Sequence, residues 1–225
     1  MALQKNDFVE LEFIGKVKGG DIFDTNIKEE AKKINLELES RPLIICLSQN
    51  MILPSIDEFL IGKDIGKYAL ELSPEKAFGN RDRTLIKTLP IRIFMEKKVY
   101  PQPGMMFEFD NVLGKVSSVS GGRVIVDFNH PLANKTVVYE LNVKKIITDE
   151  KEKISSLFSF FFRRKFEFEI EEKKVIVNAE EKLKPVFEMF APKFKEILNL
   201  DLEVEEKKKE SEEKKLDNKV EEKKQ

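Results

Sequence analysis

Strict alternation of apolar and charged side chains is the feature that most limits what this chain can fold into. Within residues 7–13, Val9, Leu11 and Phe13 alternate with two glutamates, and a longer stretch of the same kind covers residues 137–143. A period of two residues places the apolar side chains on one face of an extended strand. Both stretches are therefore expected to be strands with one buried face.

Other parts of the chain add further strands and one helix. The stretches with strand patterns are 21–24, 43–47, 68–72, 85–89, 105–109, 113–119 and 124–128. Glycine pairs at 19–20 and 121–122 indicate tight turns. Residues 54–62 begin with proline and end with glycine, which predicts a helix of about two turns. A single short helix among many strands predicts an α+β fold with an antiparallel sheet.

The composition changes after Thr148. Residues 149–153 are charged and are expected to be a linker, and residues 157–168 contain six phenylalanines. A hairpin is expected from residues 166–170 and 175–177. A closing strand is expected at residues 200–204, where Leu200, Leu202 and Val204 alternate with polar residues.

A helix is expected between these strands, with Asn178 as its N-cap. Its apolar face would hold Leu183, Val186, Phe187, Phe190 and Phe194. Pro192 is expected to kink or split this helix, because proline removes a backbone hydrogen bond. Residues 149–204 would then form a small C-terminal α+β domain. A domain of this size is marginal alone, so we expect that it buries one face against a second copy.

The charged tail, residues 205–225, holds eight acidic and eight basic side chains and only two sizeable apolar ones. Such a segment cannot bury enough apolar surface to offset its ordering entropy. We expect it to be disordered or frayed. The alternative is a solvated helix supported by Glu–Lys pairs.

Composition excludes several classes of function. The 40 basic and 41 acidic residues give a net charge of -1, so no field of one sign attracts nucleic acid or an anionic membrane. No signal peptide is apparent, and no run approaches the roughly 18 apolar residues of a membrane span. A single cysteine, Cys46, forms no internal disulfide, which favours a cytoplasmic location.

The chain also lacks the residues of common catalytic sites. Cys46 lies inside an apolar stretch and is expected to be an inert core residue. His130 stands in an expected turn before Pro131, without a second histidine or cysteine to complete a metal site, and we expect no catalytic role for it. Motifs for nucleotide binding and acyl transfer are missing. We therefore expect neither a cofactor nor a metal.

Several segments, taken in order, resemble the FKBP family of peptidyl-prolyl cis-trans isomerases. They are GGDIFDTN at 19–26, RPL at 41–43, ILPSID at 52–57, LSPEKAFG at 72–79 and the strand that carries Tyr139. The resemblance covers residues 7–147 and implies an antiparallel half-barrel around one short helix. The C-terminal part is similar, less specifically, to the long-chain archaeal members.

The resemblance extends to the SlyD-type members, which carry an extra β-rich domain in the flap. Residues 84–129 would be this insert, and the isomerase domain would comprise 1–83 and 130–148. The stretch DFNHPLA at 127–133 matches the D-x-N-H-x-L-A pattern that closes the insert in the family. This match is the most specific signal in the chain.

A prolyl pocket is implied by the same resemblance. The implied catalytic residues are Phe13, Asp24, Phe78 and Tyr139, and the implied substrate-binding residues are Phe23, Leu43, Ile52, Leu53 and Ile56. From the residues alone, the apolar ones are ordinary core positions, and the carboxyl of Asp24 is a local loop acceptor.

Two positions depart from the family pattern. Phe13 and Phe78 stand where the family most often has tyrosine, whose hydroxyls orient the pocket aspartate and donate to the substrate carbonyl. One hydrogen bond to a charged group contributes about 1.5–3 kcal/mol, so the loss corresponds to about one to two decades in rate or affinity. Weak isomerase activity is therefore expected.

The insert suggests a second route to function. Its implied client-binding residues are Ile93, Phe94, Met95, Met105 and Met106. Flexible thioethers and aromatic rings adapt to unrelated unfolded segments. For Phe107 and Phe109 the insert's own core is an equal alternative.

The expected function is thus prolyl isomerisation combined with chaperone binding of unfolded polypeptides. The alternatives are a holdase with little or no catalysis, and a scaffold that uses the C-terminal phenylalanines. The group Phe158–Phe162 is expected to lie in the domain core or in a dimer contact, with a client-binding surface as the third alternative.

Overall fold

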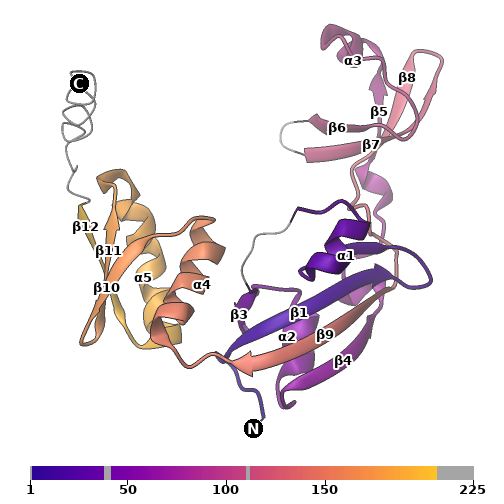
Figure 1. Cartoon of the computed structure of the whole chain (residues 1–225). Helices are drawn as coiled ribbons and strands as arrows, with labels where there is room; N and C mark the ends of the chain where they lie inside the picture. Colours follow the sequence, from indigo (N-terminus) through magenta and orange to yellow (C-terminus); the bar gives the residue numbers. More distant parts are fainter. Residues whose placement is uncertain (1, 38–41, 110–111, 207–225) are drawn as a thin grey trace, which may run out of the picture. The chain divides into compact units, whose positions relative to one another are not determined.

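The computed structural model describes residues 2–37, 42–109 and 112–206. The chain divides between Ile147 and Thr148 into two compact units (Figure 1). No helix in the described ranges is both long and apolar enough to cross a membrane. Residues 205 and 206 of the predicted charged tail belong to a strand. The rest of the tail, residues 207–225, lies outside the described residues.

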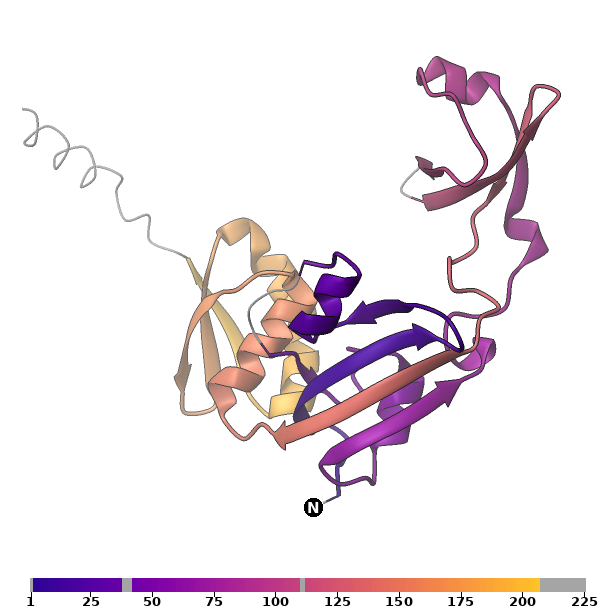
Figure 2. The same ribbon diagram turned by 45° about the vertical axis from the view of Figure 1, so that its right-hand side comes forward.

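An antiparallel five-stranded sheet forms the main body of the first unit. Its strands are β1 (Phe8–Val17), β2 (Ile22–Thr25), β3 (Ile44–Cys46), β4 (Gly66–Leu72) and β9 (Val137–Ile146). The order is β2-β1-β9-β4, and β3 also pairs with β1. Strands β1, β9 and β4 run side by side, with α2 (Pro54–Leu60) behind them (Figures 1 and 2).

The alternating pattern predicted the buried face of this sheet. Leu11 and Phe13 on β1 and Tyr139 and Leu141 on β9 are buried, whereas the glutamates between them are not. Ile56 and Leu60 of α2 are fully buried in the same apolar cluster. The α+β class and the antiparallel sheet are confirmed.

Two short helices of the first unit were not expected. They are α1 (Lys28–Lys33) and α3 (Arg92–Glu96), so the expectation of one helix is wrong. Helix α1 has two glutamates in its first turn and two lysines in its last turn. This distribution complements the helix dipole and stabilises a short helix that lacks a strong apolar period.

A second sheet occupies the predicted insert. Its strands are β5 (Ile86–Pro90), β6 (Met106–Phe109), β7 (Val112–Ser120) and β8 (Arg123–Asp127), in the order β5-β8-β7-β6. Phe94 of α3 is buried against this sheet together with valines of β7 and β8. The strands, the turn at 121–122 and the meander agree with the sequence pattern. The division of the first unit into two domains stays a prediction.

The second unit combines a three-stranded sheet with two helices. Its elements are α4 (Glu150–Phe162), β10 (Glu167–Glu171), β11 (Lys174–Ala179), α5 (Lys184–Leu198) and β12 (Asp201–Glu206). Strand β11 is central, antiparallel to β10 and parallel to β12. The predicted hairpin and closing strand are therefore present.

Two predictions for the second unit are wrong, and a third is contradicted in part. Residues 149–153 are not a linker, because Asp149 caps α4 by accepting a hydrogen bond from the Glu152 amide at 2.8 Å. Asn178 lies in β11, where it pairs with both neighbouring strands, and α5 begins at Lys184 with Pro185 in its first turn. Pro192 does not split α5, which is continuous to Leu198, and the alternative of a kink at Pro192 stays a prediction.

Packing explains why α5 tolerates its internal proline. Phe187 and Phe194 lie before and after Pro192, and both are buried. The burial of two aromatic side chains offsets the hydrogen bond that proline removes.

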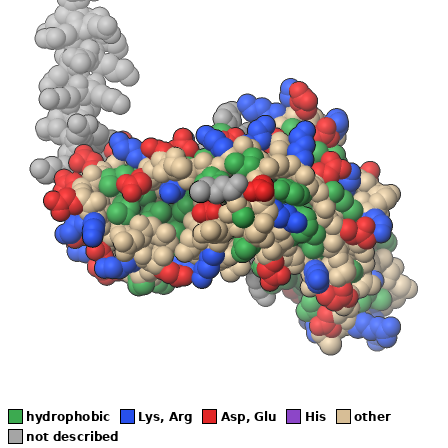
Figure 3. Space-filling model, turned by 90° about the horizontal axis from the view of Figure 1, so that it is seen from below, with side chains coloured by type: hydrophobic (Ala, Val, Ile, Leu, Met, Phe, Trp, Pro, Cys, Tyr) green, Lys and Arg blue, Asp and Glu red, His purple; other side chains and the backbone are tan. Residues whose placement is uncertain are grey.

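The charged surface of the molecule is mixed in sign, and Figure 3 shows Lys and Arg side chains interspersed with Asp and Glu on the face drawn.

Candidate functional site

Strand register brings the candidate acid and the candidate tyrosine to one face of the five-stranded sheet. Gly15 on β1 pairs with Asp24 on β2 and with Tyr139 on β9. Residues directly opposite one another share a face of the sheet. Asp24 and Tyr139 therefore flank the same glycine.

Gly15 leaves space for an aromatic ring between these two residues. The pairing of β1 with β2 is irregular between Gly15 and Lys16, and Phe23 falls in this β-bulge. A Cβ atom at position 15 would lie 2.8 Å from Cζ of Phe23 and 3.1 Å from Cε1 of Tyr139. Only glycine allows the Phe23 ring to lie over the backbone of β1.

Five rings follow one another across this face, and we call them the aromatic row: Phe13, Tyr139, Phe23, Phe78 and His130. The ring centroids are 6.2, 5.8, 5.7 and 4.5 Å apart in that order. The two middle contacts are edge-to-face, at 84° and 86°. The last contact is a parallel stack at 1°. The row joins residues that are far apart in the sequence.

The aliphatic candidates belong to the same apolar cluster as the row. Ile56 is fully buried, and Leu43, Ile52 and Leu53 are partly buried against the cluster. Ile52 and Leu53 lie in the loop just before α2, and Leu53 is the N-cap residue of that helix. All eight apolar candidates are thus brought together. Their roles in binding stay predictions.

Asp24 lies at the exposed edge of this arrangement. Its side chain is exposed at the surface, yet partial burial raises the pKa of the carboxyl, and the backbone N–H of Thr25 offsets part of this rise. Burial also raises the pKa of Tyr139, and the negative charge of Asp24 raises it further. The Tyr139 hydroxyl therefore keeps its proton at neutral pH and is available as a donor.

Asn26 is a structural residue of the site that the sequence analysis did not assign. Its Oδ1 accepts from the Phe13 amide at 2.8 Å, and its Nδ2 donates to the Leu11 carbonyl at 2.7 Å. The hydroxyl of Thr25, which is buried, donates to the Phe13 carbonyl at 2.7 Å. These bonds continue the pairing along β1 past the end of β2 and fix the position of Asp24.

A second polar network joins the segment that enters the insert, at residues 81–82, to the segment that leaves it, at residues 127–129. Arg81 donates to Oδ2 of Asp127 through Nε and Nη2, at 3.0 and 2.6 Å. The amide of Asn129 bonds the backbone of Asp82 twice, accepting from its N–H at 2.7 Å and donating to its carbonyl at 2.9 Å. This network fixes the residue that follows, His130, beside Phe78. The sequence analysis set His130 aside, although it lies inside the D-x-N-H-x-L-A match.

One buried carboxyl lies on α2, next in sequence to Ile56. The side chain of Asp57, on α2, is 3% exposed, and neither of its oxygens has a hydrogen-bond partner of ordinary geometry among the described residues. Burial raises the pKa of Asp57 to about 6, although the backbone N–H groups of Asn50 and Ser48 lower it in part. The Asp57 side chain therefore points from α2 toward the loop that contains Ser48 and Asn50.

The client-binding candidates of the insert separate into two groups. Met95, Met105 and Met106 are 37–45% exposed. Phe94 is only 2% exposed, so it belongs to the insert core and not to an exposed surface, and Ile93 is half-buried. Phe107 and Phe109 pack against the same core.

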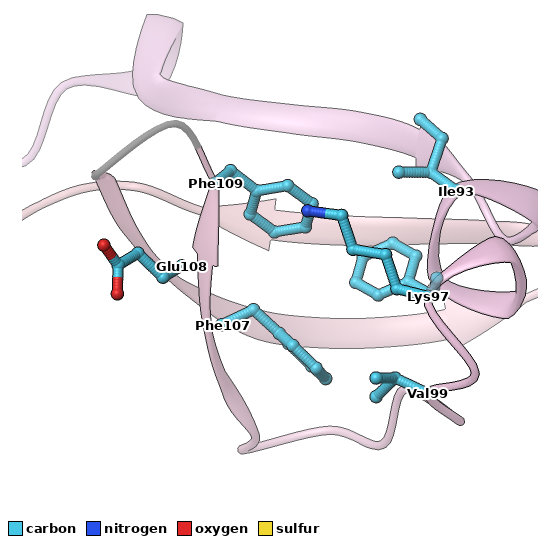
Figure 4. A pocket seen from close by; sticks show the side chains of 7 residues that line it. Ile93, Lys97, Val99, Phe107, Glu108 and Phe109 are labelled. Carbon is cyan, nitrogen blue, oxygen red and sulfur yellow. The ribbon is translucent and has the colours of Figure 1, made fainter.

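A small apolar pocket lies within the insert (Figure 4). Ile93, Phe94, Phe107 and Phe109 line it. The amine of Lys97 lies 5.4 Å from the Phe109 ring centroid. Figure 4 shows the Lys97 side chain crossing the pocket and Glu108 pointing away from it.

Comparison with known proteins identifies the family of this chain. The family model described as the FKBP26 IF domain matches residues 87–132. An FKBP-type isomerase named SlyD from Aeromonas hydrophila is 25% identical over 65% of this chain and 66% of its own length. A short-type peptidyl-prolyl cis-trans isomerase from Methanocaldococcus jannaschii is 30% identical over 67% of this chain and 98% of its own length. The chain belongs to the FKBP-type peptidyl-prolyl cis-trans isomerases.

Among solved structures, the three FKBP domains of wheat FKBP73 match at 13% identity. The match covers 66% of this chain and 42% of the wheat chain, with a TM-score of 0.35. This likeness is too low to add to the assignment. The family assignment agrees with the antiparallel sheet and with the helix α2 packed against it.

Proposed function

We propose that this FKBP-type chain accelerates cis-trans rotation of X–Pro bonds in folding polypeptides, with the aromatic row as its prolyl site. The single observation that carries the proposal is the gathering of Phe23, Phe78 and Tyr139 around Gly15, beside the carboxyl of Asp24. Residues from three strands and a loop meet there. An arrangement of this kind supports binding of a small apolar ring next to a polar group.

The proposed mechanism needs no nucleophile. Rotation of an X–Pro bond is slow because amide resonance opposes it, with a barrier of about 20 kcal/mol. The planar amide has a large dipole that water stabilises, and the twisted transition state has a smaller one. Apolar walls such as Phe23 and Ile56 therefore favour the twisted form relative to the planar form. The protonated hydroxyl of Tyr139 and the carboxylate of Asp24 supply the polar contacts.

The test is isomerisation of a short X–Pro peptide, followed by NMR exchange or by a protease-coupled assay. We expect wild-type protein to accelerate exchange and Asp24→Ala to lower kcat/KM by at least about tenfold, the effect of one hydrogen bond to a charged group. Asp21→Ala, in the same hairpin, is the matched control and should leave kcat/KM unchanged. Equal rates for the Asp24 and Asp21 variants would contradict the assignment.

We also propose that the insert holds unfolded segments near the prolyl site. The exposed methionines and the apolar pocket of Figure 4 support this, because such side chains adapt to varied apolar partners. Holding a client close raises the effective concentration of its prolines. This proposal includes a cytoplasmic location, favoured by the single cysteine.

Refolding and aggregation assays distinguish this proposal from a holdase without catalysis. Replacing Met95, Met105 and Met106 together by glutamine should weaken the suppression of aggregation and leave the short-peptide rate intact. Deletion of residues 84–129 should reduce both client binding and proline-limited refolding. Suppression of aggregation by wild-type protein without any acceleration of exchange would favour the holdase.

Self-association through the second unit is a further part of the proposal. Met189 on α5 is 69% exposed, and the neighbouring rings of Phe161 and Phe190, 4.8 Å apart, are only partly buried. A second copy would cover these side chains. Sedimentation of the full chain should show a dimer that Met189→Glu weakens, whereas a monomer at all concentrations would contradict it.

A further inference from the structure

Position 78 lacks the hydroxyl that the family pattern places there, and the structure puts another polar ring against the phenylalanine. We infer that His130 donates a hydrogen bond from Nε2 to a peptide carbonyl of the bound substrate, in place of the hydroxyl that Phe78 lacks. This inference rests on the proposed isomerase function. It names a residue for substrate contact that the sequence analysis excluded.

The position of the ring is the first argument. The imidazole of His130 lies parallel to the Phe78 ring, with centroids 4.5 Å apart and an angle of 1°. Phe78 in turn contacts Phe23, whose ring touches Tyr139. His130 is therefore one ring beyond Phe78 at the exposed end of the aromatic row.

The protonation of the ring is the second argument. The backbone N–H of Leu132 donates to Nδ1 of His130 at 3.2 Å. A neutral imidazole that accepts at Nδ1 carries its proton on Nε2. No described residue accepts a hydrogen bond from this Nε2–H, and the side chain is exposed. The ring thus presents an unused donor at the edge of the site.

The support of the ring is the third argument. His130 follows Asn129, whose amide bonds both the N–H and the carbonyl of Asp82. The backbone N–H of Asn134 donates to the carbonyl of Gly79, the residue after Phe78, at 2.9 Å. The segment after Phe78 is therefore bonded to the His130 segment both before and after His130. A donor held in this way loses little conformational entropy when substrate binds.

The experiment separates the donor from the stacked ring. His130→Phe keeps an aromatic ring on Phe78 and removes the donor, whereas Phe78→Tyr restores the hydroxyl. Four proteins are compared for kcat/KM on an X–Pro peptide: wild type, each single variant and the double variant. Circular dichroism and thermal unfolding of each protein show that the fold is kept.

We expect His130→Phe to lower kcat/KM about fivefold, the effect of one neutral hydrogen bond. In the Phe78→Tyr background the same substitution should change kcat/KM by less than about twofold, because the hydroxyl takes over the contact. A loss of equal size in both backgrounds would show a packing role and overturn the inference. Unchanged activity of His130→Phe would overturn it as well.

A third variant tests the chemistry of the donor. His130→Gln removes the ring and keeps an N–H donor, so it should retain more activity than His130→Ala in a folded protein. Equal losses in these two variants would contradict donation from position 130. If wild-type protein itself fails to accelerate exchange while folded, the proposed isomerase function fails, and this result is distinct from every outcome for His130.

Discussion

The two units of the chain are both rich in phenylalanine, yet they use it differently. In the second unit, Phe158 is fully buried and its ring contacts five others, so the cluster is closed around its centre. In the first unit, the aromatic row is open: it runs from the buried Phe13 to the exposed His130, and the exposed Asp24 lies beside it. A closed cluster gives stability, and an open row leaves ring faces for another molecule.

The two units also differ in whether they bury polar side chains. Within the described residues, the buried polar side chains are Thr25, Gln49 and Asp57, and all three belong to the first unit. The buried side chains of the second unit are apolar. Burial of polar groups costs stability unless they are paired, so they persist where they position other residues. Of the three, Thr25 is bonded to a residue of the candidate site, through the Phe13 carbonyl.

The largest effect is expected where the closed cluster is opened. Phe158→Ala should lower the stability of the second unit by about 3–5 kcal/mol, because it leaves a cavity at the contact point of five rings. Hydrogen exchange of the second-unit amides measures this loss. Phe160→Ala is the control, since Phe160 is only partly buried, and it should cost much less. Similar losses of stability in the two variants would show that the cluster of the second unit is not closed around Phe158.

The second effect concerns the buried carboxyl of the first unit. The pKa of Asp57 is raised to about 6 in the folded protein, so the folded state binds the proton more tightly than the unfolded state. Stability therefore falls as pH rises from about 4 to about 6 and stays lower above that range. Asp57→Asn should stabilise the protein at pH 7 by up to about 3 kcal/mol, and by little at pH 4.

Denaturant unfolding of wild-type protein and Asp57→Asn at both pH values measures this difference. Asp21→Asn, in an exposed turn, serves as the control for loss of one charge. A gain of the same size at pH 4 and pH 7 would contradict the titration of Asp57. A loss of stability at pH 7 would show that the carboxylate is well paired.

The third effect tests how the open row is built. Gly15→Ala should displace the rings of Phe23 and Tyr139, because the new methyl group would lie within 3.1 Å of both. Overpacking of this kind costs about 1–3 kcal/mol. Isomerase activity should fall by more than the loss of stability alone explains. Gly20→Ala, in the turn of the same hairpin, is the control, and equal activities would argue against the row as the prolyl site.

The smallest effect tests the Phe13 end of the row, near Asp24. Phe13→Tyr adds the hydroxyl that the family pattern places beside the pocket aspartate. If this hydroxyl donates to Asp24, the pKa of that carboxyl falls and kcat/KM rises by about tenfold, the lower limit for one hydrogen bond to a charged group. NMR titration of the carboxyl and peptide exchange measure the two changes. An unchanged titration would show that Phe13 lies out of reach of Asp24.

Much of the fold was predictable because strand periodicity and strand burial have the same cause. Leu11 and Tyr139 were placed on buried faces correctly from alternation alone. Helix α4 was missed because a run of phenylalanines has no helix preference, although Asp149 and Glu152 stand at capping-box spacing. Asn178 was assigned wrongly because a central strand satisfies its backbone twice, and tertiary pairing outweighs a local cap signal.

The site was predictable only where family motifs cover it. Phe23 and Phe78 were named from the motifs, but the β-bulge that lets Phe23 reach Tyr139 has no signature in a single sequence. Asn26 and His130 were overlooked for a related reason. Their roles depend on hydrogen bonds and stacking between segments that only the folded chain brings together.

The pair of hydrogen bonds between the Asn129 side chain and the backbone of Asp82 has a consequence for how such chains evolve. It keeps the exit and the return of residues 83–128 next to each other, whatever those residues contain. A short turn or an unrelated module with adjacent ends can replace them without moving Phe78. Exchange of whole modules at this point therefore offers a route to new client preferences with the same catalytic body.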